Sequence, residues 1–368
     1  MNQKLRKEVK GENFMAEYSA STIYPYDKRA IKKLDALLNQ EGIEHDKNLD
    51  YTMGLFDEEE NLVATGSCFG NTLRCLAVDS AHQGEGLMNI VVSNLIEHEY
   101  EMGRIDLFLY TKCEMAHRFS SMGFYEIARV DNKVVFMENR KTGFESYLQQ
   151  LKEETAKNPL SASAKLQGAV IMNANPFTLG HQYLLETAAK QCELLHVFIV
   201  SEDISLVPFS VREKLIREGS AQIQNLVYHT TGNYLISNAT FPSYFLKDSD
   251  TVILAHAKLD VTIFIRIAQA LNISVRFVGE EPFSHVTNLY NQIMKEQLEE
   301  NGLHCTIIPR LESAGAPVSA SSARSALQNG NMELFKSLVP ESTWRYFTSA
   351  EAKQVLEKIR TSKNVIHY

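Results

Sequence analysis

Hydrophobic and polar positions give the first part of the chain, about residues 17–140, a mixed pattern. Helical spacing is present in DKRAIKKLDALLNQEG (27–42) and LMNIVVSNLIEHEYEMG (87–103). Alternating or continuous apolar runs predict strands, and the first two are joined by acidic turn residues that predict a hairpin. The predicted strands are YTMGLFD (51–57), NLVATGSCFG (61–70), LRCLAVD (73–79) and IDLFLYT (105–111).

From Gly168 the pattern changes to strand–helix alternation. Short runs rich in β-branched residues are separated by helical segments, which is typical of buried parallel strands with crossover helices. The runs are GAVIMN, LLHVFIVS, NYLIS, SVRFVGE and HCTIIPR. Capping boxes at Ser210/Glu213 and Thr348/Glu351 predict two helix starts. We expect an α/β, doubly wound parallel sheet here, which is a Rossmann-like fold.

Composition and charge exclude several classes of function. The 368 residues carry a formal net charge of −8, so a general nucleic-acid binder is not expected. Five scattered cysteines without a CxxC pair predict neither a zinc site nor disulfides, and we predict no dedicated metal site. Residues 1–13 lack the apolar region of a signal peptide, and no run reaches the ~18 apolar residues of a membrane span. A cytoplasmic protein without membrane partners is expected.

The stretch NANPFTLGHQYL (173–184) lies between the first predicted strand of the sheet and the next helix. In open parallel sheets, ligands bind at the carboxyl ends of strands, near helix N-termini that attract anions. Pro176 would stiffen this loop, and Gly180 would let the backbone approach a ligand closely. His181 would then stand in the first helical turn, beside the anion.

A second polar stretch, VSASSAR (318–324), follows the predicted strand HCTIIPR and opens a helix. Small hydroxyl residues at a helix N-terminus together with one guanidinium form a phosphate clamp. Arg212, early in another helix, is an anion ligand or a solvated helix charge. Gly279 and Glu280 follow SVRFV at the same sheet edge, where they contact ribose or magnesium or form a turn without a ligand.

These two stretches carry a family resemblance. Thr178–His181 resembles the T/HxGH signature of the nucleotidyltransferase superfamily, and VSASSAR resembles its second signature, ISSTxxR. The resemblance implies ATP as the nucleotide, with magnesium arriving bound to it, and catalytic roles for Thr178, His181 and Arg324. The nucleotide-binding candidates are Asn173, Asn175, Pro176, Phe177, Gly180, Arg212, Gly279, Glu280, Ser319, Ser321 and Ser322.

Three longer stretches are similar to the acetate:citrate lyase ligase family, the citrate (pro-3S)-lyase ligases. They are ANPFTLGH, ATFPSYFLK (239–247) and RFVGEEPFSHVTNLYN (276–291). The resemblance implies that acetate and ATP give acetyl-AMP and pyrophosphate. The acetyl group then passes to the prosthetic-group thiol on the citrate lyase acyl-carrier subunit, which activates the lyase. Acetate and the carrier subunit are the expected partners, and the oligomeric state is left open.

In the first half, VDSAHQGEGLM (78–88) resembles the pyrophosphate loop of GNAT acetyltransferases. Gln83 and Gly86 fit that loop, whereas Met88 places a bulky side chain where the backbone would meet a phosphate. Three roles stay open for this GNAT-like domain: an acetyl-CoA-dependent transferase, recognition of the coenzyme-A-like arm of the carrier, or a purely structural part.

The expected organisation has five parts. They are a disordered or loosely ordered N-terminus (1–16), a GNAT-like domain (17–140), a helical linker (141–166), a nucleotidyltransferase domain (167–345) and a C-terminal helix (346–368). Two other functions compete with the ligase: an adenylyltransferase acting on a mononucleotide-type acceptor, and a non-catalytic nucleotide-sensing protein. Pyrophosphate release that depends on acetate separates the three.

Overall fold

The computed structural model describes residues 18–202, 204–235, 241, 249–280, 285–313 and 316–362. The expected N-terminal part, 1–16, lies outside these residues. The chain divides into two compact units next to Gly143, and the start of helix α7 (Ser249–Leu271), up to Ala255, is grouped with the first unit. Each unit is described by itself. Within the described residues, no helix combines the length and the apolar composition needed to cross a bilayer.

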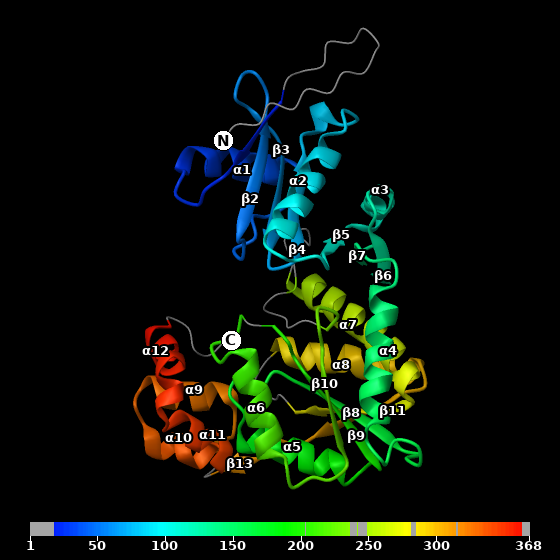
Figure 1. The fold of residues 1–368 in the computed structure, drawn as a ribbon, viewed down its shortest axis with the longest axis vertical. Helices are drawn as coiled ribbons and strands as arrows, with labels where there is room; N and C mark the ends of the chain where they lie inside the picture. Colours follow the sequence, from blue (N-terminus) through cyan, green and yellow to red (C-terminus); the bar gives the residue numbers. More distant parts are fainter. Residues whose placement is uncertain are drawn as a thin grey trace. The chain divides into compact units, whose positions relative to one another are not determined.

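The first unit is built on one seven-stranded sheet in the order β1-β2-β3-β4-β5-β7-β6 (Figure 1). Its neighbours pair antiparallel except β4 and β5, which are parallel. The strands are β1 (Ser19–Thr22), β2 (Tyr51–Phe56), β3 (Leu62–Phe69), β4 (Thr72–Val78), β5 (Phe108–Thr111), β6 (Tyr125–Val130) and β7 (Val134–Glu138). The helices are α1 (Lys28–Gln40), η1 (Ser80–His82), α2 (Leu87–Glu101), η2 (Cys113–Met115) and α3 (Ala116–Ser121).

Separate apolar clusters show how helices cover this sheet. Leu34 and Leu38 of α1 pack in one cluster, and Val91 and Leu95 of α2 pack in another with Phe119 of α3. The predicted hairpin of β2 and β3 is confirmed. This arrangement is the mixed α/β fold expected for the first part of the chain.

The second unit contains a five-stranded, fully parallel sheet in the order β10-β9-β8-β11-β12. The strands are β8 (Gln167–Met172), β9 (Leu194–Ile199), β10 (Leu226–Thr230), β11 (Ile273–Gly279) and β12 (His304–Ile308), and a small hairpin joins β13 (Glu312–Ser313) to β14 (Ala316–Pro317). The helices are α4 (Gly143–Ala156), α5 (Leu179–Ala189), α6 (Phe209–Gly219), α7 (Ser249–Leu271), α8 (His285–Glu300), α9 (Ala320–Gln328), α10 (Met332–Leu338), α11 (Glu341–Phe347), η3 (Ala350–Ala352) and α12 (Lys353–Thr361). The doubly wound sheet is therefore confirmed, with its change of direction between β8 and β11.

The two faces of this sheet differ in polarity. One face is apolar and packs with α5, α6 and the C-terminal helices around residues such as Val197 and Phe335. The other face carries polar side chains and receives α4 and α7 (Figure 1). Arg276 of β11 pairs there with Asp260 of α7 at 2.9 Å, and both side chains are buried. Charged groups in such a position need a partner, which this pairing provides.

The segment expected as a linker, 141–166, differs from that expectation. Its helix α4 buries Tyr147, Leu148 and Leu151, and the hydroxyl of Tyr147 donates to the carbonyl of Thr230 at 2.9 Å. Its apolar stripe therefore belongs to the packing of the second unit, because a solvated linker would leave these side chains exposed.

Three local predictions were wrong. NYLIS does not supply a strand, since residues 233–235 form a turn, 236–237 lie outside the described residues, and the strand is Leu226–Thr230. The helix expected to be capped by Ser210 begins at Phe209, after Pro208, without a side-chain cap. Thr348 ends α11 rather than capping a new helix.

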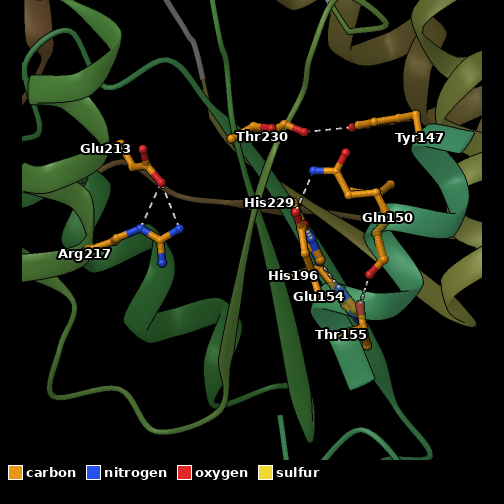
Figure 2. A network of polar contacts seen from close by, with 10 residues as sticks. Tyr147, Gln150, Glu154, Thr155, His196, Glu213, Arg217, His229 and Thr230 are labelled. Carbon is orange, nitrogen blue, oxygen red and sulfur yellow. Dashed lines mark hydrogen bonds and ion pairs between the residues drawn. The ribbon is translucent and has the colours of Figure 1, made fainter. Parts of the chain in front are cut away.

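A chain of buried polar side chains crosses the polar face of the sheet. His196 Nε2 lies 2.9 Å from the amide oxygen of Gln167, and its Nδ1 lies 3.0 Å from His229 Nε2. His229 Nδ1 lies 2.6 Å from a carboxylate oxygen of Glu154 on α4. Figure 2 shows His196, His229 and Glu154. Burial, with the neighbouring His229, lowers the pKa of His196 to about 3, so this ring is neutral.

The contact with Gln167 indicates which nitrogen of His196 carries the proton. Because Gln167 offers an oxygen, His196 must donate from Nε2 and accept at Nδ1. His229 Nδ1 lies within ion-pair distance of the Glu154 carboxylate, and this contact ties α4 to the sheet. Burial raises the pKa of Glu154, but the hydrogen bonds from His229 and Gln150 outweigh it and lower that pKa overall.

We predict that His196 makes the second unit less stable in mild acid. Its pKa is about 3 when folded and near 6.5 when unfolded, so below pH 6.5 only the unfolded chain takes up the proton. Lowering the pH from 7 to 5 should remove about 2 kcal/mol of its contribution to the free energy of unfolding. His196→Gln should flatten this pH dependence in urea unfolding, while the exposed-residue control His304→Gln should not. Equal slopes in all three proteins would contradict this assignment.

Candidate active site

A cavity of about 860 Å³ opens at the carboxyl ends of β8 and β11, where the sheet changes direction. Its size suits a nucleotide, and its position is where open α/β sheets bind ligands. It brings together side chains from both sequence motifs, about 140 residues apart. The predicted residues that line it are Asn173, Asn175, Thr178, Gly180, His181, Gly279, Glu280, Ser319, Ser321, Ser322 and Arg324.

Helix α5 begins at Leu179 with Thr178 as its N-cap. Thr178 and His181 form a reciprocal capping pair, in which the Thr178 hydroxyl oxygen lies 2.8 Å from His181 Nδ1 and the Thr178 backbone N–H donates to the same nitrogen at 3.1 Å. The histidine thus occupies the position that a glutamate takes in an ordinary capping box. His181 therefore stands in the first turn of α5, as the sequence predicted.

These contacts set the tautomer of His181. A backbone N–H can only donate, so Nδ1 must be an acceptor and the ring proton lies on Nε2. Burial, followed by the charges of Arg310 and Arg324, lowers the pKa of His181 to about 4. At neutral pH the side chain is therefore an uncharged hydrogen-bond donor, and the positive charge of the site belongs to the two arginines.

The second motif lines the same cavity. Ser319 caps α9 by accepting the backbone N–H of Ser322 at 3.0 Å. Its hydroxyl lies 2.9 Å and 2.8 Å from the hydroxyls of Ser321 and Ser322, so three hydroxyl groups cluster at the helix N-terminus. Arg324 is 2% exposed, donates to the carbonyl of Asn175 at 2.5 Å, and has its pKa lowered to about 10 by burial. Together these groups are suited to bind phosphate oxygens.

Gly180 allows the two motifs to approach each other. A Cβ added at this position would lie 2.7 Å from the carbonyl oxygen of Val318. The sequence predicted that this glycine would let the backbone approach a ligand, and in the structure it admits the backbone of the second motif. The close approach places the start of α5 beside the start of α9.

Three sequence-predicted residues do not line the cavity. Arg212 was predicted to be an anion ligand or a solvated helix charge, and both predictions are wrong. Its side chain is fully buried and donates to the carbonyls of Asn173, Val200, Glu202 and Val207. Pro176 and Phe177 are buried behind the cavity wall. A guanidinium enclosed by backbone carbonyls ties the ends of β8 and β9 to α6 and has no face left for a ligand.

Sequence reasoning missed Arg310. This half-buried arginine lines the cavity and acts electrostatically on His181. It follows β12 by two residues, so its place after a parallel strand, at the ligand edge of the sheet, was the signal that pointed to it. Glu280 is exposed and is the only carboxylate among the described residues that line the cavity.

The first unit has a cavity of its own, of about 490 Å³. The parallel strands β4 and β5 pair only at Thr72–Phe108 and Leu73–Leu109, and beyond these pairs both strands line the cavity. Gly84 and Gly86 have positive φ values of 95° and 77°, and Gly86 caps α2. Met88 lines the same cavity, beside two cations, Lys112 and Arg118.

Residues 167–347 match the family model for the citrate lyase ligase C-terminal domain. The chain is 39% identical to the citrate (pro-3S)-lyase ligase of Klebsiella pneumoniae over 322 residues, which cover 86% of this chain and 92% of the relative. It is 37% identical to the ligase of that name from Escherichia coli K12, in an alignment that covers 88% of this chain and 93% of the relative. It is 33% identical to the ligase of Haemophilus influenzae, with 87% of this chain and 96% of the relative covered.

Solved structures align with about a third of the chain. A putative acyl-CoA N-acyltransferase from Klebsiella pneumoniae covers 33% of this chain and 95% of its own, with 19% identity and a TM-score of 0.28. A GNAT-family acetyltransferase from Staphylococcus aureus covers 32% of this chain and 97% of its own, with 15% identity and a TM-score of 0.28.

We predict that Gly180→Ala separates the two motifs. The added methyl group would overlap the Val318 carbonyl oxygen, which is backbone and cannot rotate away. Overpacking of this kind costs about 1–3 kcal/mol in the free energy of unfolding, and ATP affinity should fall together with it. Thermal unfolding and calorimetric titration with ATP measure both effects. An unchanged melting temperature and ATP affinity would show that the loop relaxes without cost.

Proposed function

The chain belongs to the citrate (pro-3S)-lyase ligase family, and from this premise we propose that it is an ATP-dependent acetate ligase that activates citrate lyase. In the first step acetate and ATP give acetyl-AMP and pyrophosphate. In the second step the acetyl group passes to the thiol of the prosthetic group on the acyl-carrier subunit of citrate lyase. The observation that carries this proposal is the single cavity in which both motifs meet.

The first step is a substitution at phosphorus. A carboxylate oxygen of acetate bonds to the α-phosphorus of ATP, the bond from that phosphorus to the bridging oxygen breaks, and pyrophosphate leaves. Such a transfer needs positioning and charge neutralisation more than covalent help from the protein. We assign the β- and γ-phosphates to the hydroxyls of Ser319, Ser321 and Ser322 with Arg324, because these groups cluster at the α9 N-terminus.

His181 is proposed to donate from Nε2 to the α-phosphate as negative charge develops there. It does so as a neutral group, because its Nδ1 is held by Thr178. Arg310, which also lines the cavity, supplies further positive charge to the reacting anions. Magnesium bound to ATP would neutralise phosphate charge, and Glu280 is the lining carboxylate placed to contact it or its waters.

In the second step the carrier thiolate attacks the acetyl carbonyl carbon. The carbon–sulfur bond forms, the bond to the AMP oxygen breaks, and AMP leaves. We propose that the cavity of the first unit binds the coenzyme-A-like arm of the carrier. Support comes from its diverging strands, from the glycine turn at α2 and from Lys112 and Arg118, which suit an extended amide-bearing arm with phosphates. We place the reaction in the cytoplasm.

The alternative of an adenylyltransferase acting on a mononucleotide is not favoured. The ligase relatives align over 86–88% of this chain, a span too long to lie within the second unit alone. A mononucleotide acceptor gives no reason for a first unit with its own cavity.

We predict that pyrophosphate release from ATP and magnesium depends on acetate and is lost in His181→Ala. Removing one donor to a developing phosphate charge should lower kcat by about 10²–10³-fold. A coupled pyrophosphate assay with acetate, propionate or a mononucleotide as the acceptor measures this. The exposed-residue control His304→Gln should retain wild-type rates. Release only with the mononucleotide would replace the ligase by an adenylyltransferase.

The pH dependence should reflect a neutral His181. Because its pKa is about 4, the imidazole stays uncharged throughout the range from pH 5.5 to 8. Protonation at Nδ1 would break the bond from Thr178, so activity should be lost only as the pH falls toward 4. The profile of kcat/KM for ATP tests this, and an acid limb centred near 6.5 would show that the ring titrates as an exposed histidine does.

A further inference from the structure

The peptide group between Phe177 and Thr178 is bonded at both of its polar ends. Its carbonyl oxygen, which belongs to Phe177, accepts a hydrogen bond from the hydroxyl of Thr343 at 2.9 Å. Its N–H, which belongs to Thr178, donates to His181 Nδ1 at 3.1 Å. One peptide plane therefore lies between a side chain of α11 and the histidine of the first motif.

Planarity makes the two bonds depend on each other. The C=O and N–H of one peptide point in opposite directions within a rigid plane, so fixing the oxygen also fixes the direction of the hydrogen. A donor on the oxygen polarises the peptide and strengthens the N–H as a donor. Thr343 thus acts on His181 without touching it, across 162 positions of sequence.

The surroundings leave this peptide few other orientations. Thr343 and Phe177 are both 0% exposed. The Phe177 ring lies beside the His181 ring, with 5.8 Å between the centroids, and packs so closely on α6 that a Cβ at Gly219 would come within 2.5 Å of it. Neither water nor a ligand replaces the Thr343 hydroxyl in such a site without displacing the packed ring.

We propose that Thr343 is a positioning residue for His181: through the Phe177–Thr178 peptide it holds the imidazole with its proton on Nε2, facing the reactants. This inference rests on the proposed function of the cavity and extends it to the C-terminal helices. It also gives the helix α11 a role in the reaction besides covering the sheet.

The bond from the Thr178 N–H disfavours a proton on His181 Nδ1. Weakening it should let the ring protonate at higher pH, against the opposing charges of Arg310 and Arg324, which act on the same ring. A protonated ring no longer accepts from Thr178, so it loses both its tautomer and its fixed direction. A residue that only stabilises the fold would change neither property.

The test compares Thr343→Val, which keeps the shape and removes the hydroxyl, with Thr343→Ser, which keeps the hydroxyl. The matched control is Thr65→Val, because Thr65 is also 0% exposed and donates to a carbonyl, that of Met53, at 2.8 Å in the first unit. Rates are measured as acetate-dependent pyrophosphate release, and the imidazole nitrogens of His181 are observed by ¹⁵N NMR in the full chain across pH 4–8.

Thr343→Val should lower kcat by about 10-fold, with less than a two-fold change in KM for ATP. It should also move the acid limb of the pH profile to higher pH and shift the His181 nitrogen signals toward those of the protonated ring. Thr343→Ser should restore all three, and Thr65→Val should alter none. Wild-type nitrogen signals and an unmoved acid limb in Thr343→Val would overturn the proposal, even if the variant unfolds at lower temperature. If wild-type protein releases no acetate-dependent pyrophosphate, the proposed function fails, whereas the nitrogen signals still decide the role of Thr343.

Discussion

The contact between the start of α5 and the start of α9 is the constraint on which the rest of the site depends. Without a side chain at Gly180, the Val318 carbonyl approaches the first turn of α5, and Arg324 reaches the carbonyl of Asn175. Two helix N-termini therefore open into one cavity. Helix N-termini and hydroxyl side chains are groups that favour anions, which is why we assign the phosphates to this cavity.

The electrostatics of the cavity follow from this packing. Burial removes the charge from His181, and Arg310 and Arg324 add to that effect while supplying the positive charge themselves. The histidine and the arginines therefore have different roles. A neutral imidazole donates a directed hydrogen bond, whereas a guanidinium neutralises charge over several oxygens. The same low-dielectric environment makes the orientation of each donor count for more than it would in water.

Buried polar groups set the geometry of the second unit well beyond the cavity. The guanidinium of Arg212 joins the ends of two strands to α6 through backbone carbonyls, and the pair of His229 and Glu154 fastens α4 to the sheet. Each such group would be costly if left alone, so each is accompanied by its partners. The apolar face of the sheet stabilises the fold by burying hydrophobic side chains, whereas these polar contacts select one arrangement of loops and helices.

The sequence by itself determined the class of fold, the doubly wound sheet and the two motif loops. The fold class and the sheet follow from hydrophobic period and local residue chemistry, whereas Thr178, His181, Ser319 and Arg324 were predicted from these loops together with their resemblance to known signatures. Only the tertiary structure decided that Arg212 is buried, that Arg310 lines the cavity and that Thr343 bonds the motif loop. Those facts depend on which distant segments meet, and neither a residue's type nor its spacing encodes whether its neighbours in space are carbonyls or solvent.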